Sequence, residues 1–202
     1  MSSSRGDRTS IAGTISSAAF ASGDRFVIGC WSRSPIGPFS DIMWIDRRGL
    51  RTLITCSQEA ADFIANIYQF DHVMVTPLYV TSTPSTTIAR SEEFDIRLNG
   101  GRLRSLLPPR PLSVTRYFEA PVARRLMGVE TYGSSPTGVR EWYQARRWRR
   151  VRSATARWGS QDLGELVEDL RPINVGFSNP PKLASIVPIK VTIERSVQSL
   201  AG

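Results

Sequence analysis

The stretch RFVIGCWSRSPIGPFSDIMWIDRRGLRTLITC, residues 25–56, determines the architecture that we expect for the whole chain. It contains apolar runs rich in β-branched and aromatic residues, at 25–31, 41–46 and 50–56. Turn signals separate these runs, because Ser34-Pro35-Ile36-Gly37-Pro38 and Arg47-Arg48-Gly49 hold residues that interrupt a regular ladder. Short strands joined by tight turns predict an antiparallel sheet.

The rest of the chain continues this pattern. After Ser57, a residue type that caps helices, apolar residues at helical spacing predict a helix over 58–68. Asn99-Gly100-Gly101 is typical of a hairpin turn, since Asn and Gly tolerate positive φ. Further strands are expected at 72–83, 86–98, 102–107, 112–118, 139–147, 149–158, 175–178 and 186–194, and short helical segments at 120–127 and 162–169.

These elements predict a mainly β protein of the α+β class, with about ten strands and a few short helices. Closing such a sheet into an antiparallel β-barrel or cone, fully or nearly, removes its unpaired edges and leaves an interior suited to a small ligand. Residues 1–22 are rich in Ser, Ala and Gly and are expected to form a flexible tail. Residues 23–202 are expected to form a single β domain.

The composition argues against several classes of protein and site. No apolar run is long enough to span a membrane as a helix, and the N-terminus lacks the apolar core of a secretory signal. We therefore expect a cytoplasmic protein with no membrane partner. Cys30 and Cys56 lie in apolar runs and are expected to be reduced and buried. Two cysteines and one histidine, His72, cannot build a Cys/His zinc site, and glycine motifs for nucleotides are absent, so no metal or cofactor is expected.

The segment from Trp31 to Met43 resembles a stretch of the acetoacetate decarboxylase superfamily, in which a Ser-Pro-apolar-Gly-Pro-aromatic-x-acid motif leads into a strand. The closing segment 175–181 fits the same resemblance, which covers roughly residues 25–195 and implies that family's β fold. It matches Asp41 to an acid of the family's active site. The family's Schiff-base lysine follows the helix, but residues 66–72 contain no lysine here, so the resemblance implies a divergent member and this departure argues against decarboxylase activity.

Amine catalysis requires a primary amine with a lowered pKa in a dry pocket. Lys182 follows two prolines and is expected to be solvated. Lys190 lies on the polar face of the last expected strand, where it either lines the interior or pairs with Glu194 at the surface. A Schiff-base lyase or decarboxylase that uses Lys190, with Asp41 as the acid, is therefore one alternative function.

The function that we expect first is binding of a small organic anion, such as a carboxylate, or an enzyme reaction not yet assigned. An inward-pointing Arg33 would clamp a carboxylate in bidentate fashion, with Asp41 nearby. Trp44 and Tyr68 either line this ligand site or belong to the core. His72, next to Asp71, is either a general base or a structural hydrogen-bonding residue.

A basic stretch from Arg146 to Arg157 is interleaved with aromatic residues, and the net charge of the chain is +8. This composition is compatible with nucleic acid or an acidic partner, which is the second alternative function. Strand alternation places Arg147 and Arg149 on the face opposite Arg150, so the charge is split between two faces. The stretch therefore indicates a solvated surface, an interior anion site or a partner surface, and a homo-oligomer through exposed sheet is also compatible with the sequence.

Overall fold

The computed structural model describes residues 7–106, 132–134, 139–145, 147–168, 171, 174–175 and 183–195. Within these residues the protein has fourteen strands and one helix. In chain order they are β1 (Asp7–Phe20), β2 (Arg25–Arg33), β3 (Phe39–Ile45), β4 (Arg51–Thr55), α1 (Gln58–Ala65), β5 (His72–Val75), β6 (Tyr79–Ser82), β7 (Thr86–Arg90), β8 (Phe94–Leu106), β9 (Tyr132–Ser134), β10 (Arg140–Ala145), β11 (Arg147–Trp158), β12 (Gln161–Asp162), β13 (Leu166–Val167) and β14 (Ser185–Arg195).

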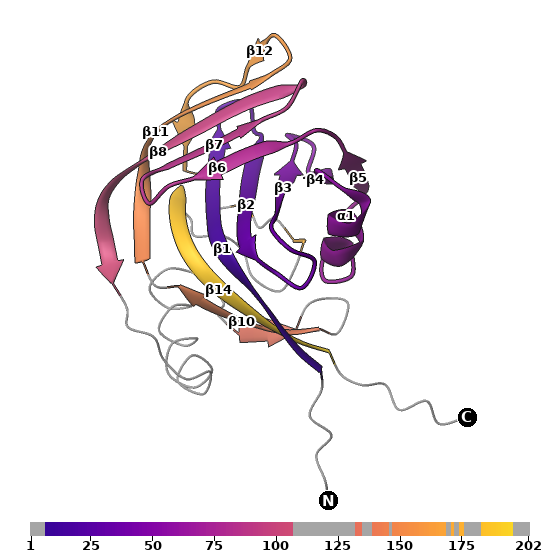
Figure 1. The fold of residues 1–202 in the computed structure, drawn as a ribbon. Coiled ribbons are helices and arrows are strands. Elements are labelled where there is room, and N and C mark those ends of the chain that lie inside the picture. The colour runs from indigo at the N-terminus through magenta and orange to yellow at the C-terminus, as the bar shows by residue number, and fades with distance from the viewer. Residues whose placement is uncertain are drawn as a thin grey trace, which may run out of the picture.

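The main sheet follows the order β5-β4-β3-β2-β1-β14-β11-β8-β7-β6, and every pairing along it is antiparallel except that of β4 with β5. The sheet curls into an open half-barrel, with α1 beside β4 and β5 (Figure 1). The curl brings β6 back toward β2, since the Cys30 thiol lies 3.9 Å from the Val80 carbonyl oxygen. The predicted fold class, a mainly β protein built on a curled antiparallel sheet, is confirmed.

Both faces of the sheet are covered, because neighbouring residues of a strand point to opposite sides. On β2 and β3, Phe26, Ile28 and Ile42 face an apolar cluster shared with β7, β8 and β11. Trp31 and Phe39 face a second cluster, which includes residues of α1 and β14 and has Tyr143 of β10 packed against it. Each of the two candidate sites described below adjoins a different one of these clusters.

Helix α1 begins as the sequence predicts and ends earlier. The Ser57 hydroxyl accepts a hydrogen bond from the Ala60 backbone at 3.2 Å, and Ala60, Ala61 and Ile64 are buried. After Ala65 the chain turns, with the Tyr68 amide donating to the Ile64 carbonyl. This turn places the Tyr68 side chain against β10, where it takes part in the second candidate site.

The expectation of a flexible tail is wrong for residues 7–20, which form β1 between β2 and β14. One of the small residues that suggested a tail, Gly13, permits a close approach of β2, because a Cβ there would lie 2.1 Å from the Cys30 carbonyl oxygen. Ile11 and Phe20 are buried in the two apolar clusters. The strand is thus a central part of the sheet.

The expected hairpin at Asn99-Gly100-Gly101 is also wrong, since β8 runs straight through it. None of these residues has positive φ, and Asn99 and Gly100 pair with Ser153 and Val151 of β11 across a bulged ladder. A Cβ at Gly101 would lie 2.6 Å from the Arg152 side chain. The glycines therefore serve a close approach between strands.

Three further expectations differ from the structure. Residues 162–169 were expected to be helical, but β12 and β13 flank a turn in which Gly164 has a φ of +83°. The strand expected at 72–83 is divided into β5 and β6, with Pro77 between them, because proline lacks the donor that a ladder needs. Cys56 is exposed and Cys30 half-buried, and both thiols are free. The segments expected at 112–118, 120–127 and 176–178, and Lys182, lie outside the described residues.

Within the part of the chain that the structure describes, no helix has the length and apolar character needed to cross a membrane.

Candidate functional site

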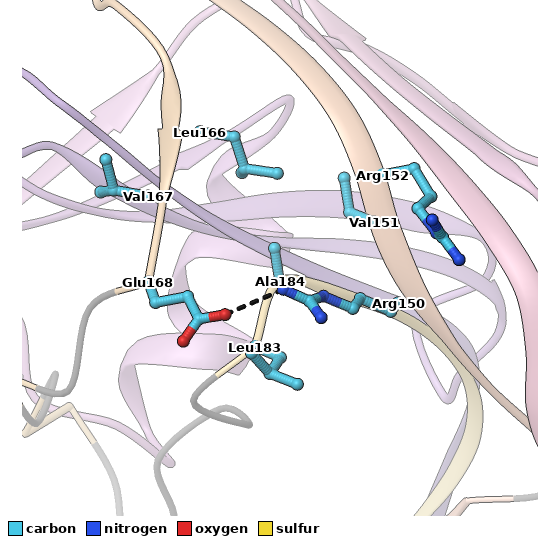
Figure 2. A pocket seen from close by; sticks show the side chains of 8 residues that line it. All are labelled: Arg150, Val151, Arg152, Leu166, Val167, Glu168, Leu183 and Ala184. Carbon is cyan, nitrogen blue, oxygen red and sulfur yellow. Dashed lines mark hydrogen bonds and ion pairs between the residues drawn. The ribbon is translucent and has the colours of Figure 1, made fainter.

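A hollow of about 560 Å³ lies between β11, the segment around β13 and the chain that leads into β14 (Figure 2). Its lining combines charged and apolar side chains. The lining residues are Arg150, Val151, Arg152, Leu166, Val167, Glu168, Leu183 and Ala184.

Irregular pairing of β11 explains why three consecutive residues line the same hollow. The β11–β8 register shifts between Arg149 and Val151 and again between Val151 and Ser153. Such bulges disturb the strict alternation of a strand and redirect its side chains. Arg150 and Arg152 therefore reach the hollow on either side of Val151, whose amide donates to the Ala184 carbonyl at 2.8 Å.

The two arginines differ in their partners. Arg150 donates to Glu168 at 2.8 Å across the hollow, as the dashed line in Figure 2 shows. Arg152 is exposed, and among the described residues no acid forms an ion pair with it. The lining thus carries two guanidinium groups and one carboxylate, which leaves one guanidinium available to an anion.

A second group of polar residues lies buried on the α1 side of the sheet. Tyr68 donates a hydrogen bond to Glu141 Oε2 at 2.6 Å, and Tyr143 donates to the same oxygen at 3.1 Å. The two phenol oxygens are 2.5 Å apart. Glu141 has no exposed surface, so the carboxyl group depends on these phenols for its hydrogen bonds.

Burial governs the electrostatics of this group. Loss of hydration raises the pKa of Glu141 to about 7, although the hydrogen bonds from Tyr68 and Tyr143 act in the opposite direction. Burial also raises the pKa of both tyrosines well above the ordinary value, and nearby negative charge adds to this effect. At neutral pH the phenols are therefore protonated and act as donors. The pKa of the Glu141 carboxyl group lies close to neutral pH, so both its protonated and its ionised forms are populated.

Asp41 is buried on β3, and its Oδ1 accepts a hydrogen bond from Trp31 Nε1 at 2.6 Å. Burial raises the pKa of Asp41 to about 6, and the hydrogen bond from Trp31 only partly offsets it. The charge of Asp41 contributes to the raised pKa of Tyr143, which places the two groups within electrostatic reach. Asp41 thus belongs with the buried polar group and does not line the hollow.

Among the other residues singled out from the sequence, Tyr68 alone joins Asp41 in this buried group. Trp44 is a core residue, stacked on Trp158 with ring centroids 4.2 Å apart. Arg33 is exposed at the end of β2 and does not line the hollow. His72 is exposed, and its neighbour Asp71 is held by Arg51 at 2.7 Å, which lowers the pKa of Asp71 below its ordinary range.

Lys190 is exposed on β14, where it pairs with Ala12 of β1 and Gln144 of β10. Tyr143 pairs with Val191 and Glu141 with Ile193, one and three residues further along β14. Paired residues on adjacent strands share a face, so Lys190 lies on the face opposite Glu141 and Tyr143.

Sequence reasoning missed Glu141 and the glutamate of the hollow, Glu168. A signal for Glu141 was present, because alternation places it on the same face as Val139 and Tyr143, both of which pack against the second apolar cluster. An acid on an apolar face is a mark of a functional or specifically paired group. Nothing local distinguishes Glu168, whose partner Arg150 is reached only through the fold.

No protein-family model and no curated protein matches this chain. A crystal structure of acetoacetate decarboxylase from Legionella pneumophila aligns with 94% of this chain and 84% of that chain, at 9% identity and a TM-score of 0.42. At this identity and score, the alignment carries no conclusion about activity or ligand.

Proposed function

We propose that the protein binds a small organic anion, such as a carboxylate, in the hollow beside β11. The observation that carries this proposal is the pair of guanidinium groups, from Arg150 and Arg152, set against a single carboxylate in the lining. Guanidinium groups bind carboxylates through charge-assisted, bidentate hydrogen bonds. Leu166, Val167 and Leu183 add an apolar wall for the body of the ligand.

Arg152 is the residue on which the anion depends most in this proposal. Arg150 is already engaged with Glu168, whereas Arg152 is exposed and packs its aliphatic part over Gly101. Because the site is open to water, the guanidinium contributes a modest amount of binding energy, about 1.5 kcal/mol for a charged hydrogen bond. Any reaction on this anion is outside the proposal, since the residues that line the hollow include no serine, threonine, cysteine, lysine or histidine.

The Schiff-base alternative receives no support from the described residues. Lys190 is exposed on β14, whereas amine catalysis needs an amine in a dry pocket.

A fluorescence titration with 8-anilinonaphthalene-1-sulfonate tests the proposal, because this probe joins an anionic group to an apolar body. We expect saturable binding, which Arg152→Gln weakens about tenfold. The matched control is Arg157→Gln, which removes an exposed arginine of the same strand outside the hollow and leaves the affinity unchanged. The neutral analogue N-phenyl-1-naphthylamine should be insensitive to both substitutions.

Equal losses of the sulfonate probe in Arg152→Gln and Arg157→Gln would mean that general charge, and not the hollow, attracts the anion. A parallel loss of the neutral probe in Arg152→Gln would show that the substitution disturbs packing. Near-ultraviolet circular dichroism of each variant identifies the second case independently.

A further inference from the structure

The carboxyl group of Glu141 is only half satisfied. Oε2 accepts hydrogen bonds from both Tyr68 and Tyr143, but Oε1 is buried and has no hydrogen-bond partner among the described residues. Leaving a buried polar oxygen unpaired costs about 1–3 kcal/mol, and more when the group is charged. Oε1 is thus a buried acceptor that the described residues leave unsatisfied, on a group already oriented by two phenols, and it calls for an explanation.

The groups that face Glu141 supply no positive charge within the part of the chain that the structure describes. From β14 the facing residues are Val191 and Ile193, and from β9 the pairing residue is Gly133. From the segment after α1 comes the phenol of Tyr68, and from β10 that of Tyr143. From β3 comes another acid, Asp41, whose charge acts on Tyr143.

Nearby cations are directed elsewhere. Arg140 precedes Glu141 on β10 and therefore points to the other face, where it pairs with Glu194 at 3.5 Å. Arg8 pairs with the same Glu194 and lies over the ring of Trp142, 5.6 Å from its centroid. Among the described residues, neither Glu141 nor Asp41 forms an ion pair with a basic side chain.

Aromatic rings line this side of the sheet. Tyr68, Tyr143 and Phe63 pack against the cluster that contains Trp31 and Phe39. Phe39 lies 6.2 Å from Trp31 and 5.9 Å from Phe63, measured between ring centroids. Acids surrounded by aromatic rings attract organic cations, because ring faces add to the attraction of the carboxylates.

We propose that Glu141, Tyr68 and Tyr143 form a second binding site, which takes the ammonium group of a small primary amine and pairs one of its N–H groups with Glu141 Oε1. The site is separate from the hollow, whose residues Val151, Leu166 and Ala184 belong to the other apolar cluster. The inference does not depend on the proposed anion site, and either can fail alone.

An ammonium group fits this site better than two other donors. A neutral hydroxyl would satisfy Oε1 but leave the buried negative charge of Glu141 uncompensated. A metal ion needs several oxygen ligands, and the described residues contain no group of three or more acids, histidines or cysteines that could hold one. A primary ammonium supplies both the charge and the N–H donor.

Carbon-13 NMR of glutamate carboxyl groups tests the proposal by following the pKa of Glu141 directly. The resonance is assigned by its loss in Glu141→Gln. Methylammonium chloride is compared with sodium chloride and tetramethylammonium chloride at equal ionic strength. Because methylammonium binds the ionised carboxyl group, we expect it to lower the pKa of Glu141 by about 0.5, a roughly threefold change in proton dissociation.

Tetramethylammonium carries the same charge without an N–H group, so it should lower the pKa of Glu141 by much less than methylammonium does. An unchanged pKa in methylammonium would overturn the proposal, and an equal fall with tetramethylammonium would reduce it to general screening. Glu165→Gln, which removes an exposed acid, should preserve the response. If Glu141→Gln does not fold, Tyr143→Phe assigns the resonance instead, because loss of that hydrogen-bond donor raises the pKa of Glu141.

Discussion

At Gly29 the chain has no room for a side chain. A Cβ there would lie 2.3 Å from Asp41 Oδ1 and 2.5 Å from Trp31 Nε1, the two atoms that share a buried hydrogen bond of 2.6 Å. The bond therefore crosses directly over the glycine, and the absence of a Cβ is what allows the acid and the indole to meet inside the sheet.

Gly29→Ala should destabilise the protein by about 3 kcal/mol, because it separates a buried acid from its donor. Urea unfolding measures the loss. A double-mutant cycle with Trp31→Phe, which removes the donor, isolates the cause: in the Trp31→Phe background the alanine should cost much less. The same cost in both backgrounds would mean that the methyl group acts through crowding of the backbone and not through this hydrogen bond.

Glu141 makes the stability of the fold depend on pH. Its pKa is about 7 in the folded protein against an ordinary 4.5, so over this interval the folded state keeps a proton that the unfolded state has released. Stability attributable to this group therefore falls as pH rises, by about 3 kcal/mol in total, and stays constant above the folded pKa.

Glu141→Gln cannot ionise and should lose that part of the pH dependence. The difference in unfolding free energy between about pH 5 and about pH 8, measured in urea, should shrink by about 2.5 kcal/mol relative to the unsubstituted protein, since part of the effect falls below pH 5. Asp41, with a pKa raised to about 6, keeps part of the dependence in the same direction. An unaltered difference in Glu141→Gln would show that the carboxyl group of Glu141 titrates as an ordinary acid.

At the scale of elements, sequence patterns predicted the strands, turns and helix start that are determined by interactions between residues close in the chain. The strands over 25–56 and the start of α1 at Ser57 follow from β-branched runs, turn residues and a helix cap. Composition misled at β1, where Ser, Ala and Gly indicated a tail. At Gly13 the small residue is required because β2 lies too close for a Cβ, a requirement that only the assembled sheet reveals.

The same distinction applies to the sites. Asp41 and Tyr68 were identified from the sequence. The buried acid to which Tyr68 donates, Glu141, is 73 positions away, on β10. The hollow depends on bulges in β11, and no local signal announces a bulge that lets Arg150, Val151 and Arg152 share one lining. Contacts between side chains on strands that are far apart in the sequence are therefore the part of the sites that sequence patterns could not predict.

At the scale of the whole molecule, one long pairing joins the two ends of the described chain. β1 pairs with β14 from Asp7–Arg195 to Ser17–Ser185, and this ladder forms the middle of the ten-strand path. Both apolar clusters include residues of these two strands. The two candidate sites consequently adjoin different apolar clusters, and the same central ladder contributes residues to both clusters.

The net charge of +8 predicts that the protein is retained on heparin, and the structure indicates how that retention is distributed. The basic stretch does not form a single stripe: Arg149 donates to the Gly101 carbonyl, Arg150 pairs with Glu168, and Arg157 is exposed elsewhere on β11. Retention should therefore follow total charge, with no single arginine dominant.

Arg157→Gln in the stretch and Arg33→Gln at the end of β2 each remove one exposed charge from different parts of the molecule. We expect both to lower the salt concentration of elution by a similar small amount, as does Arg147→Gln. A much larger decrease for Arg147→Gln and Arg157→Gln than for Arg33→Gln would show that the stretch acts as one surface. Nucleic acid or an acidic partner would then be the better assignment, since a partner's phosphates or carboxylates would have to span the two arginines together.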